Sequence, residues 1–208
     1  MRVNLFFKRI FDVFFSIVGI VICIPFFIII SIIIKVSSKG PVLFKQTRVG
    51  KNHKNFKILK FRTMITDAQK KGLSITVGED ARITSAGRFL RKTRLDELPQ
   101  LLNILIGDMS FVGPRPEVPE YVEFYNEEQR KILNIRPGLT DYASICFKNE
   151  SEILANSHDP QKEYIENIMP LKIKYNMKYI NKINVVHDVK IISLTFWAVM
   201  GGKVEIRI

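Results

Sequence analysis

The segment VFFSIVGIVICIPFFIIISIII, Val13–Ile34, runs for 22 residues without a charged side chain. A straight α-helix of this length measures roughly 33 Å, which matches the ~30 Å hydrocarbon core of a bilayer. Hydropathy alone therefore favours a helix that spans a membrane. A cleaved signal peptide fits less well, because the run is longer than a usual signal core and no small-residue cleavage motif follows it.

Other features of this segment favour a helix that enters the membrane and returns to the same side. Pro25 lies inside the run, where it removes a backbone donor and favours a bend. Basic residues flank both ends of the run, so the positive-inside rule gives no orientation. They are Lys8 and Arg9 before it, and Lys35 and Lys39 after it. Asp12 is spaced to pair with Lys8 across one helical turn. The residues alone leave the spanning and the re-entrant topology open.

The composition of the chain indicates a globular domain with an anionic partner. Its 208 residues allow one ordinary domain plus a small appendage. The net charge of +12 indicates nucleic acid, an anionic membrane surface or a phosphorylated small molecule as partner. Cys23 and Cys146 lie in unlike surroundings far apart in the sequence, which argues against a disulfide. No CxxC motif or Cys/His cluster is present in the sequence, which argues against a structural zinc site.

Beyond the apolar segment, the pattern predicts an α+β domain that is mostly helical. Strand-like stretches at Val42–Phe44 and Phe56–Phe61, joined around Val49–Asn52, predict a small β-hairpin. Helices are expected at Ser85–Arg94 with Ser85 as N-cap, at Asp96–Leu105 with Gly107 ending it, within 117–133, over 160–181 and at Val186–Met200. We therefore expect a membrane segment, residues 1–36, and a single domain, residues 37–208, with amphipathic helices at the membrane interface.

Two adjacent acids, Asp96 and Glu97, lie in the stretch TRLDELPQLLNIL, Thr93–Leu105. Asp is a good N-cap, Glu is favoured in a first turn and Pro is common near helix starts, so a helix start explains the pair when it is taken alone. Cations lie close upstream, however, and ionised carboxylates near cations can attack phosphorus or hold a magnesium ion. The pair is therefore a candidate reaction centre as well as a candidate cap.

Several basic residues are candidate phosphate ligands. Arg115 lies between prolines in Gly113-Pro114-Arg115-Pro116, which pre-orients a guanidinium for two-pronged binding. Arg136 precedes Pro137 and Gly138 in a similar setting, and Arg91 belongs to the basic stretch before the acidic pair. Lys60 and Arg62 alternate along the second expected strand and would share one of its faces. Taken singly, each is also explained by a solvated turn or an exposed strand face.

Five stretches of the chain form a recognisable set, in this order: Phe7–Asp12 (FKRIFD), Phe56–Met64 (FKILKFRTM), Leu95–Leu101 (LDELPQL), Gly107–Pro116 (GDMSFVGPRP) and Arg136–Thr140 (RPGLT). In these stretches the chain resembles the bacterial sugar transferases, specifically the small monotopic phosphoglycosyl transferases. Together the five stretches extend over about the first two thirds of the chain. The run GDMSFVGPRP is long enough to make chance agreement negligible.

The resemblance implies an enzyme that moves a phospho-sugar from a UDP-sugar to undecaprenyl phosphate and releases UMP. Asp96 would be the nucleophile that forms a covalent intermediate, and Glu97 would bind Mg²⁺. Arg115, Lys60 and Arg91 would bind phosphate. The N-terminal helix would be re-entrant and broken at its proline, with both termini in the cytoplasm.

The same resemblance implies a place in the bacterial inner membrane, in contact with its lipids, with the catalytic domain facing the cytoplasm. The product, an undecaprenyl-diphosphate sugar, would serve capsule, O-antigen or glycoprotein synthesis. A homo-oligomer is possible, and the sequence does not determine the oligomeric state.

The alternative is a non-catalytic, membrane-tethered basic protein that binds lipid head groups or nucleic acid. The sequence has no basic helix interleaved with aromatic residues and no known nucleic-acid motif, and the acidic pair would repel a polyanion. We therefore expect no nucleic-acid partner.

The chain also departs from the family pattern. Residues Asp141–Glu150 replace the Gly-Trp-Ala and Asn-Gly-Arg-Asn stretches of better-known members, which indicates a different subgroup and leaves the sugar open. Asn176 stands where an Asp would be expected, and no role is carried over to it.

Overall fold

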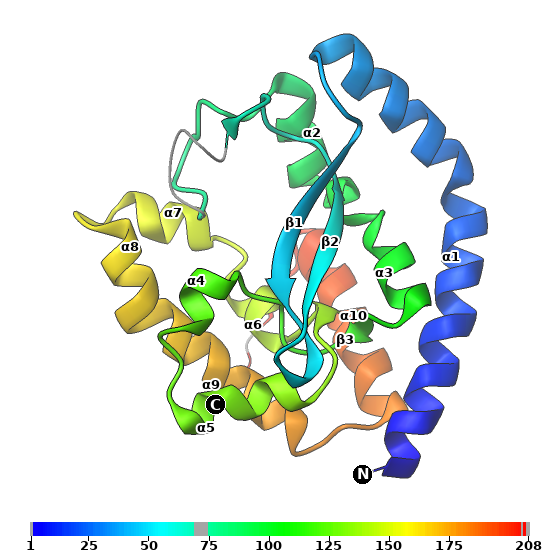
Figure 1. Cartoon of the computed structure of the whole chain (residues 1–208), viewed down its shortest axis with the longest axis vertical. Coiled ribbons are helices and arrows are strands. Elements are labelled where there is room, and N and C mark those ends of the chain that lie inside the picture. The colour runs from blue at the N-terminus through cyan, green and yellow to red at the C-terminus, as the bar shows by residue number, and fades with distance from the viewer. Residues whose placement is uncertain (1, 69–74, 205, 207–208) are drawn as a thin grey trace.

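The computed structural model describes residues 2–68, 75–204 and 206, with side chains from residue 4 onward. Helices make up most of this part of the chain, around two small pairs of strands (Figure 1). The expected architecture, mostly helical with a small β-hairpin and one long apolar N-terminal helix, is confirmed.

The elements follow one another in this order: α1 Arg2–Ser37, β1 Leu43–Val49, η1 Lys51–His53, β2 Asn55–Phe61, α2 Ser85–Lys92, η3 Leu95–Glu97, α3 Gln100–Ile106, β3 Ser110–Val112, α4 Pro119–Val122, α5 Glu127–Arg130, η4 Lys131–Asn134, β4 Gly138–Thr140, α6 Tyr142–Cys146, α7 Glu150–Ala155, α8 Pro160–Glu163, η5 Tyr164–Ile168, α9 Met169–Ile180 and α10 Val185–Val199.

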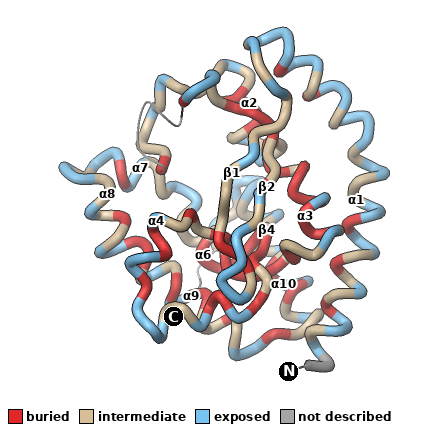
Figure 2. Tube along the Cα trace, in the orientation of Figure 1, coloured by how far each residue is buried: buried red, intermediate tan, exposed pale blue. Residues whose placement is uncertain are grey.

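The N-terminal helix α1 runs along one side of the domain (Figure 1). Helix α1 continues through Pro25 as a single element, so the expected break into two helices is not seen. Among the described residues it is the one helix long and apolar enough to cross a membrane, with a mean hydropathy of 3.3. Only 11% of that apolar window is buried, and Figure 2 shows much of the helix exposed. Its apolar surface is therefore not explained by a protein core.

The first part of α1 is fixed to the domain by polar contacts. Lys8 Nζ donates to Asp188 Oδ2 of α10 at 2.5 Å, so the expected pairing of Lys8 with Asp12 is not seen. Asp12 Oδ1 instead accepts hydrogen bonds from Ser110 Oγ at 3.1 Å and from the Phe111 amide at 3.0 Å. These partners satisfy buried charges that helix α1 could not satisfy by itself.

The last part of α1 contacts the same domain. Ile30 and Ile34 pack with Phe61 of β2 and Leu90 of α2 in one buried cluster. Just beyond the helix, the Arg62 guanidinium donates to the backbone carbonyls of Ser38 and Lys39, at 2.7 Å each. Both ends of the apolar helix are therefore attached to the domain.

The predicted hairpin is confirmed. Strands β1 and β2 pair antiparallel, with Leu43 opposite Phe61 and Val49 opposite Asn55. The connection includes Asn52 at φ 55°, a left-handed conformation that Asn tolerates in turns. Figure 1 shows the hairpin across the middle of the molecule.

A second strand pair brings two proline motifs together. Strands β3 and β4 pair parallel, with Ser110 opposite Gly138 and Val112 opposite Thr140. The backbones approach so closely that a Cβ on Gly138 would lie 2.1 Å from the Gly113 nitrogen. Glycine is therefore required where the GPRP and RPG motifs meet.

The helices near the acidic pair differ in detail from the expected ones. Thr84, not Ser85, caps α2, because its side chain accepts from the Gly87 amide at 3.0 Å. The expected helix Asp96–Leu105 is a 3₁₀ turn, η3, followed by α3. Gly107 ends α3 at φ 98°, as predicted.

The C-terminal half forms the main cores. Tyr121, Leu133, Leu154 and Ile173 belong to one buried cluster, and a second gathers Val112 and Tyr179 with Ile191 of α10. Residues 117–133, where a helix is expected, contain the short helices α4 and α5 and the first residues of the 3₁₀ helix η4. The expected helical stretch 160–181 is confirmed as α8, η5 and α9, and Val186–Met200 corresponds to α10.

Candidate active site

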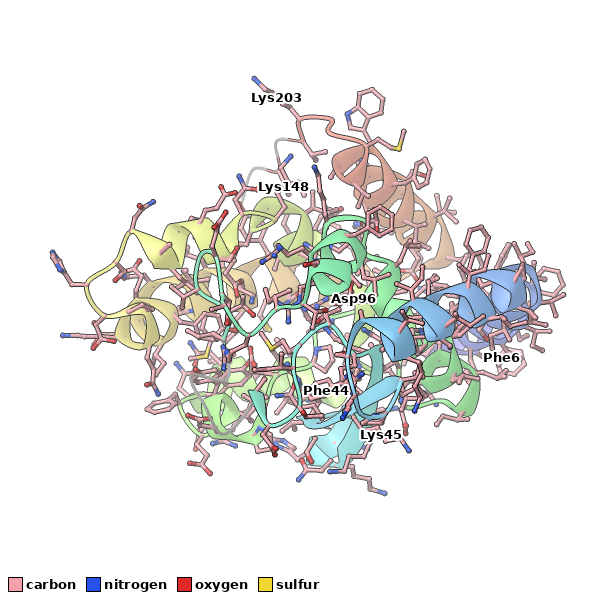
Figure 3. All side chains as sticks on the ribbon, turned by 90° about the horizontal axis from the view of Figure 1, so that it is seen from above. Phe6, Phe44, Lys45, Asp96, Lys148 and Lys203 are labelled. Carbon is pink, nitrogen blue, oxygen red and sulfur yellow. The ribbon has the colours of Figure 1, made fainter. Side chains whose placement is uncertain are left out.

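The acidic pair lies on the 3₁₀ turn η3 between α2 and α3, and Asp96 is labelled near the centre of the view in Figure 3. Asp96 is 7% exposed and Glu97 8% exposed. Pro99 occupies the N-cap position of α3, and no side chain makes a capping hydrogen bond there. The helix-cap explanation of the pair is therefore wrong, and two buried carboxylates need another explanation.

Glu97 is held by two cations. Lys60 Nζ donates to its Oε1 at 2.8 Å, and Arg115 Nη2 donates to the same oxygen. Arg115 Nη1 lies 3.5 Å from Oε2. Burial by itself would raise the pKa of Glu97, but the charges and hydrogen bonds of Arg115 and Lys60 hold it well below its usual range. Glu97 is therefore an ionised carboxylate of fixed orientation.

Asp96 lies in a different environment, although it is the adjacent residue. Its Oδ1 is buried and has no hydrogen-bond partner. Burial raises the pKa of Asp96 above the ordinary value, while the charges of Lys60, Arg91 and Arg94 oppose this rise and that of Glu97 adds to it. A carboxylate that no hydrogen bond occupies keeps its lone pairs available for attack on an electrophile.

Arg91 reaches the site from α2. Its Nε donates to Thr63 Oγ1 at 2.9 Å and its Nη1 to Thr76 Oγ1 at 3.1 Å. Burial lowers the pKa of Arg91, and Asp96 is the strongest of the charges that oppose the shift. The two threonines thus orient a cation whose field acts on Asp96.

The loop that carries Arg115 is held by a residue to which no role was assigned from the sequence. Asp141 Oδ2 accepts a hydrogen bond from the Arg115 amide at 3.1 Å, and its Oδ1 accepts from the Ser144 amide at 2.6 Å. Asp141 is buried and is the N-cap of α6. An Asp before a short helix was a capping signal, but its contact with Arg115 depends on the β3–β4 pairing.

Arg48 is a second residue that sequence reasoning missed. Its Nη1 donates to the Pro116 carbonyl at 3.0 Å and to Glu117 Oε1 at 3.2 Å. These bonds support the Pro-Arg-Pro loop from strand β1. The alternation along β1 gave no signal that separates Arg48 from an ordinary strand residue.

Two predicted phosphate ligands form hydrogen bonds away from the acidic pair. Arg62 is bonded to the chain just after α1, as described above. Arg136 Nε donates to the Gly107 carbonyl at 2.8 Å, at the C-terminal end of α3. The structure thus brings Lys60, Arg91 and Arg115 to Asp96 and Glu97, and gives Arg62 and Arg136 contacts that fasten helix ends.

The protein side chains at this site could hold a magnesium ion only together with substrate phosphates and water. Among the described residues, no three His, Cys, Asp or Glu side chains cluster as a metal site. Mg²⁺ commonly uses one or two carboxylates together with substrate phosphates and water. Glu97 fits this pattern, because its Oε2 has only the 3.5 Å contact with Arg115.

The chain was compared with known protein families and curated proteins. The family model described as bacterial sugar transferase matches residues 3–202. The exopolysaccharide production protein PSS of Rhizobium leguminosarum bv. phaseoli is 45% identical over 157 residues, which cover 68% of this chain and 74% of that protein.

Two longer relatives match nearly the whole chain. The UDP-N-acetylgalactosamine-undecaprenyl-phosphate N-acetylgalactosaminephosphotransferase of Aeromonas hydrophila is 33% identical over 95% of this chain and 44% of its own length. The UDP-glucose:undecaprenyl-phosphate glucose-1-phosphate transferase of Escherichia coli (strain K12) is 34% identical over 93% of this chain and 40% of its own. The chain thus spans less than half of each of these two proteins. Because the family model extends over nearly all of the sequence, the chain belongs to the bacterial sugar transferases.

Proposed function

We propose that this protein transfers a sugar 1-phosphate from a UDP-sugar to undecaprenyl phosphate, releases UMP and forms an undecaprenyl-diphosphate sugar. The observation that carries the proposal is the contrast within the acidic pair. Glu97 is fixed by Lys60 and Arg115, whereas Asp96 has a buried oxygen without a hydrogen bond. The printed names of relatives support the donor and acceptor classes and differ in the sugar.

In the first step, a carboxylate oxygen of Asp96 attacks the phosphorus that carries the sugar. A new P–O bond forms as the P–O bond to UMP breaks, and UMP leaves with the electron pair of that bond. Phosphoryl transfer depends chiefly on positioning and on neutralising charge. Arg115, Lys60 and Arg91 are placed to supply positive charge around the phosphate oxygens.

In the second step, a phosphate oxygen of the lipid attacks the same phosphorus. The bond to Asp96 breaks, and the carboxylate leaves with its electrons restored. A covalent route divides one displacement into two, so the soluble donor and the lipid acceptor need not be bound together.

Glu97 would hold Mg²⁺ in this proposal. The ion would neutralise charge on the phosphate oxygens when bound. Arg115 and Lys60 orient Glu97 toward that role, because they fix its Oε1 and leave Oε2 with one long contact.

The arrangement of α1 supports a topology in which both ends of the helix lie on the same side of the membrane, as the re-entrant topology requires. A spanning helix would carry one of its ends to the opposite face of the bilayer. Here Lys8 near one end and Ile34 near the other both contact the domain. The exposed apolar side chains of α1 would lie in the membrane, and exposed Phe196 and Trp197 of α10 would lie at its interface. The domain would face the cytoplasm at the bacterial inner membrane.

The proposal is tested with full-length protein in lipid nanodiscs. UMP release from a panel of UDP-sugars is measured with undecaprenyl phosphate, and intact-protein mass spectrometry without acceptor looks for a phospho-sugar adduct. Asp96→Asn should give neither UMP nor adduct, while its matched control Asp159→Asn, at an exposed N-cap of α8, should give both. Undiminished turnover in Asp96→Asn would overturn the covalent role. A non-catalytic binding protein would release no UMP from any donor.

A further inference from the structure

Gln100, the first residue of α3, is a fully buried amide without a hydrogen bond. The residue is 1% exposed, and its Nε2 has no partner. An unsatisfied buried donor is costly, because the amide has given up its bonds to water and gained none in the protein. An apolar side chain of similar size would be more stable at the same position. Packing alone therefore does not explain why residue 100 is Gln.

Asn103, one turn later on α3, is a buried amide whose hydrogen bonds have a clear structural role. Its Nδ2 donates to the Lys57 carbonyl at 2.9 Å, and its Oδ1 accepts from the Leu59 amide at 2.9 Å. Both groups bond to the edge of strand β2 and fasten α3 to the hairpin. Gln100, which is as deeply buried, makes no such bond.

Gln100 follows Asp96 by four residues, just over one turn of helix. Leu98 and Pro99, which link η3 to α3, both have right-handed helical backbone angles. Backbone bonds from Leu98 N to Leu95 O and from Leu101 N to Leu98 O continue the turn across the junction. These are i→i+3 bonds of the 3₁₀ type, on which side chains four residues apart are offset by about 120° around the axis. The reacting residue and the unpaired amide therefore lie on consecutive turns of one short segment.

Each of the two side chains lacks the kind of hydrogen-bond partner that the other could provide. Gln100 Nε2 is a buried donor without an acceptor, and Asp96 Oδ1 is a buried acceptor without a donor. Both atoms are inaccessible to solvent, so the oxygen that meets the substrate is the other one, Oδ2. Gln has three rotatable side-chain bonds, and a rotamer change can bring its amide toward the neighbouring turn.

Resting on the proposed function, we propose that Gln100 is a positioning residue that donates a hydrogen bond from Nε2 to Asp96 Oδ1 during phosphoryl transfer. The bond holds the carboxylate plane so that Oδ2 points at the phosphorus. Lys60, Arg91 and Arg94 supply charge around Asp96 but make no hydrogen bond with it in the structure. In this proposal, Gln100 is therefore the residue that orients the attacking oxygen.

The test compares Gln100→Met and Gln100→Leu with the matched variant Asn103→Leu, in the full chain in nanodiscs. Both Gln100 variants remove the donor and keep a side chain of similar volume. We expect them to lower kcat roughly 10- to 100-fold, as befits one lost bond to a charged group, with little change in KM for the UDP-sugar. Their melting temperature should equal or exceed that of the wild type. Asn103→Leu should lower the melting temperature, because it leaves backbone groups of β2 unpaired.

Two results would overturn this role. One is a wild-type kcat in both Gln100 variants. The other is a loss of melting temperature as large as that of Asn103→Leu in both of them, which would make the amide structural. The parallel Asp96→Asn arm separates the two proposals. If Asp96→Asn is inactive and Gln100→Met is not impaired, only the positioning role fails, whereas turnover in Asp96→Asn removes the proposed function itself.

Discussion

Lys8 and Asp188 are separated by 180 residues in the sequence and form a buried ion pair with an Nζ–Oδ2 distance of 2.5 Å. Tyr179 donates a further hydrogen bond to Asp188 Oδ1 at 2.7 Å. The pair links the apolar N-terminal helix to α10, the last helix of the domain. It makes the apolar N-terminal helix part of the domain's structure, in addition to any role as an anchor.

Breaking this pair from one side should destabilise the protein. Lys8→Met leaves Asp188 buried without its cation, which costs about 3 kcal/mol or more. The double variant Lys8→Met/Asp188→Leu should recover much of the loss, because no uncompensated charge remains. Thermal unfolding in detergent measures both variants, with Lys35→Met at an exposed position of α1 as control. A double variant no more stable than Lys8→Met would contradict the ion-pair account.

The two ends of α1 should be on the same side of the membrane. With Cys23 and Cys146 replaced by Ser, single cysteines are placed at Phe6 and at Lys39, and Lys148→Cys marks the domain. An impermeant thiol reagent should label all three only after the inner membrane is opened. Labelling of Phe6→Cys or Lys39→Cys alone in intact spheroplasts would show a spanning helix.

Loss of the Glu97 charge should destabilise the site and reduce its response to magnesium. Glu97→Gln leaves Lys60 and Arg115 without their shared partner, at a cost of about 3 kcal/mol at neutral pH. Because folding lowers the pKa of Glu97, its contribution is full above the ordinary value near pH 4.3 and is lost as pH falls through the folded pKa. The two proteins should therefore converge in stability at acid pH. Urea unfolding of the wild type and of Glu97→Gln at neutral and at acid pH measures this convergence. Glu128→Gln, at an exposed pair with Lys131, serves as control and should change little.

The response of Glu97→Gln to Mg²⁺ is measured separately, by UMP release. Activity of Glu97→Gln should be low and should rise less with added MgCl₂ than that of the wild type. Identical magnesium titration curves would remove Glu97 as the ligand.

The pH dependence of activity should report the burial of Asp96. Its raised pKa puts the acid limb of kcat/KM, which reports the free enzyme, above the ordinary aspartate value of about 3.9, because only the ionised form attacks phosphorus. Arg91→Gln should move the limb to still higher pH, since the Arg91 charge opposes the rise. A limb at or below pH 3.9 would contradict the burial effect.

The raised pKa also predicts the stability of Asp96→Asn. A folded pKa above the unfolded one gives stability that is present below the unfolded pKa and is lost as pH rises through the folded pKa. Asn stays neutral throughout, so the variant should melt above the wild type at pH 7, and below pH 3 the two should agree. Scanning calorimetry at both pH values measures the difference.

Asp141 should matter for both stability and turnover. Asp141→Ala removes the cap of α6 and the partner of the Arg115 amide, at a cost of about 1–2 kcal/mol. Turnover should fall as well, because the loop that presents Arg115 to Glu97 loses its support. Asp159→Ala, which removes only the N-cap of α8, should lower stability and leave kcat unchanged. Equal kcat in the two variants would show that Asp141 is only a cap.

Much of this architecture could be read from local patterns. The apolar run Val13–Ile34 identifies α1, the alternation around Lys60 identifies the hairpin, and Gly107 marks the end of α3. The RPGLT and GDMSFVGPRP motifs identify the family. Each of these signals lies within one short stretch, because helix and strand periods, turn residues and linear motifs depend on neighbours in the chain.

The assignment of basic residues to the site could not be read in this way. Lys60 and Arg62 alternate on one strand and looked equivalent, yet Lys60 bonds to Glu97 and Arg62 to the carbonyls after α1. Arg115 and Arg136 lie in similar proline motifs, yet only Arg115 reaches the acidic pair. A hydrogen bond requires two groups within about 3 Å and at a favourable angle, and the placement of both depends on the whole fold.

The sequence by itself determined that one helix is apolar enough for a membrane, that a hairpin follows it and that two acids stand side by side. Tertiary structure alone decided that Glu97 is bound by cations while Asp96 has an unpaired oxygen, and that Lys8 pairs with Asp188 instead of nearby Asp12. The physical reason is that charge environment and burial arise from segments that meet in space, which for these pairs lie up to 180 residues apart.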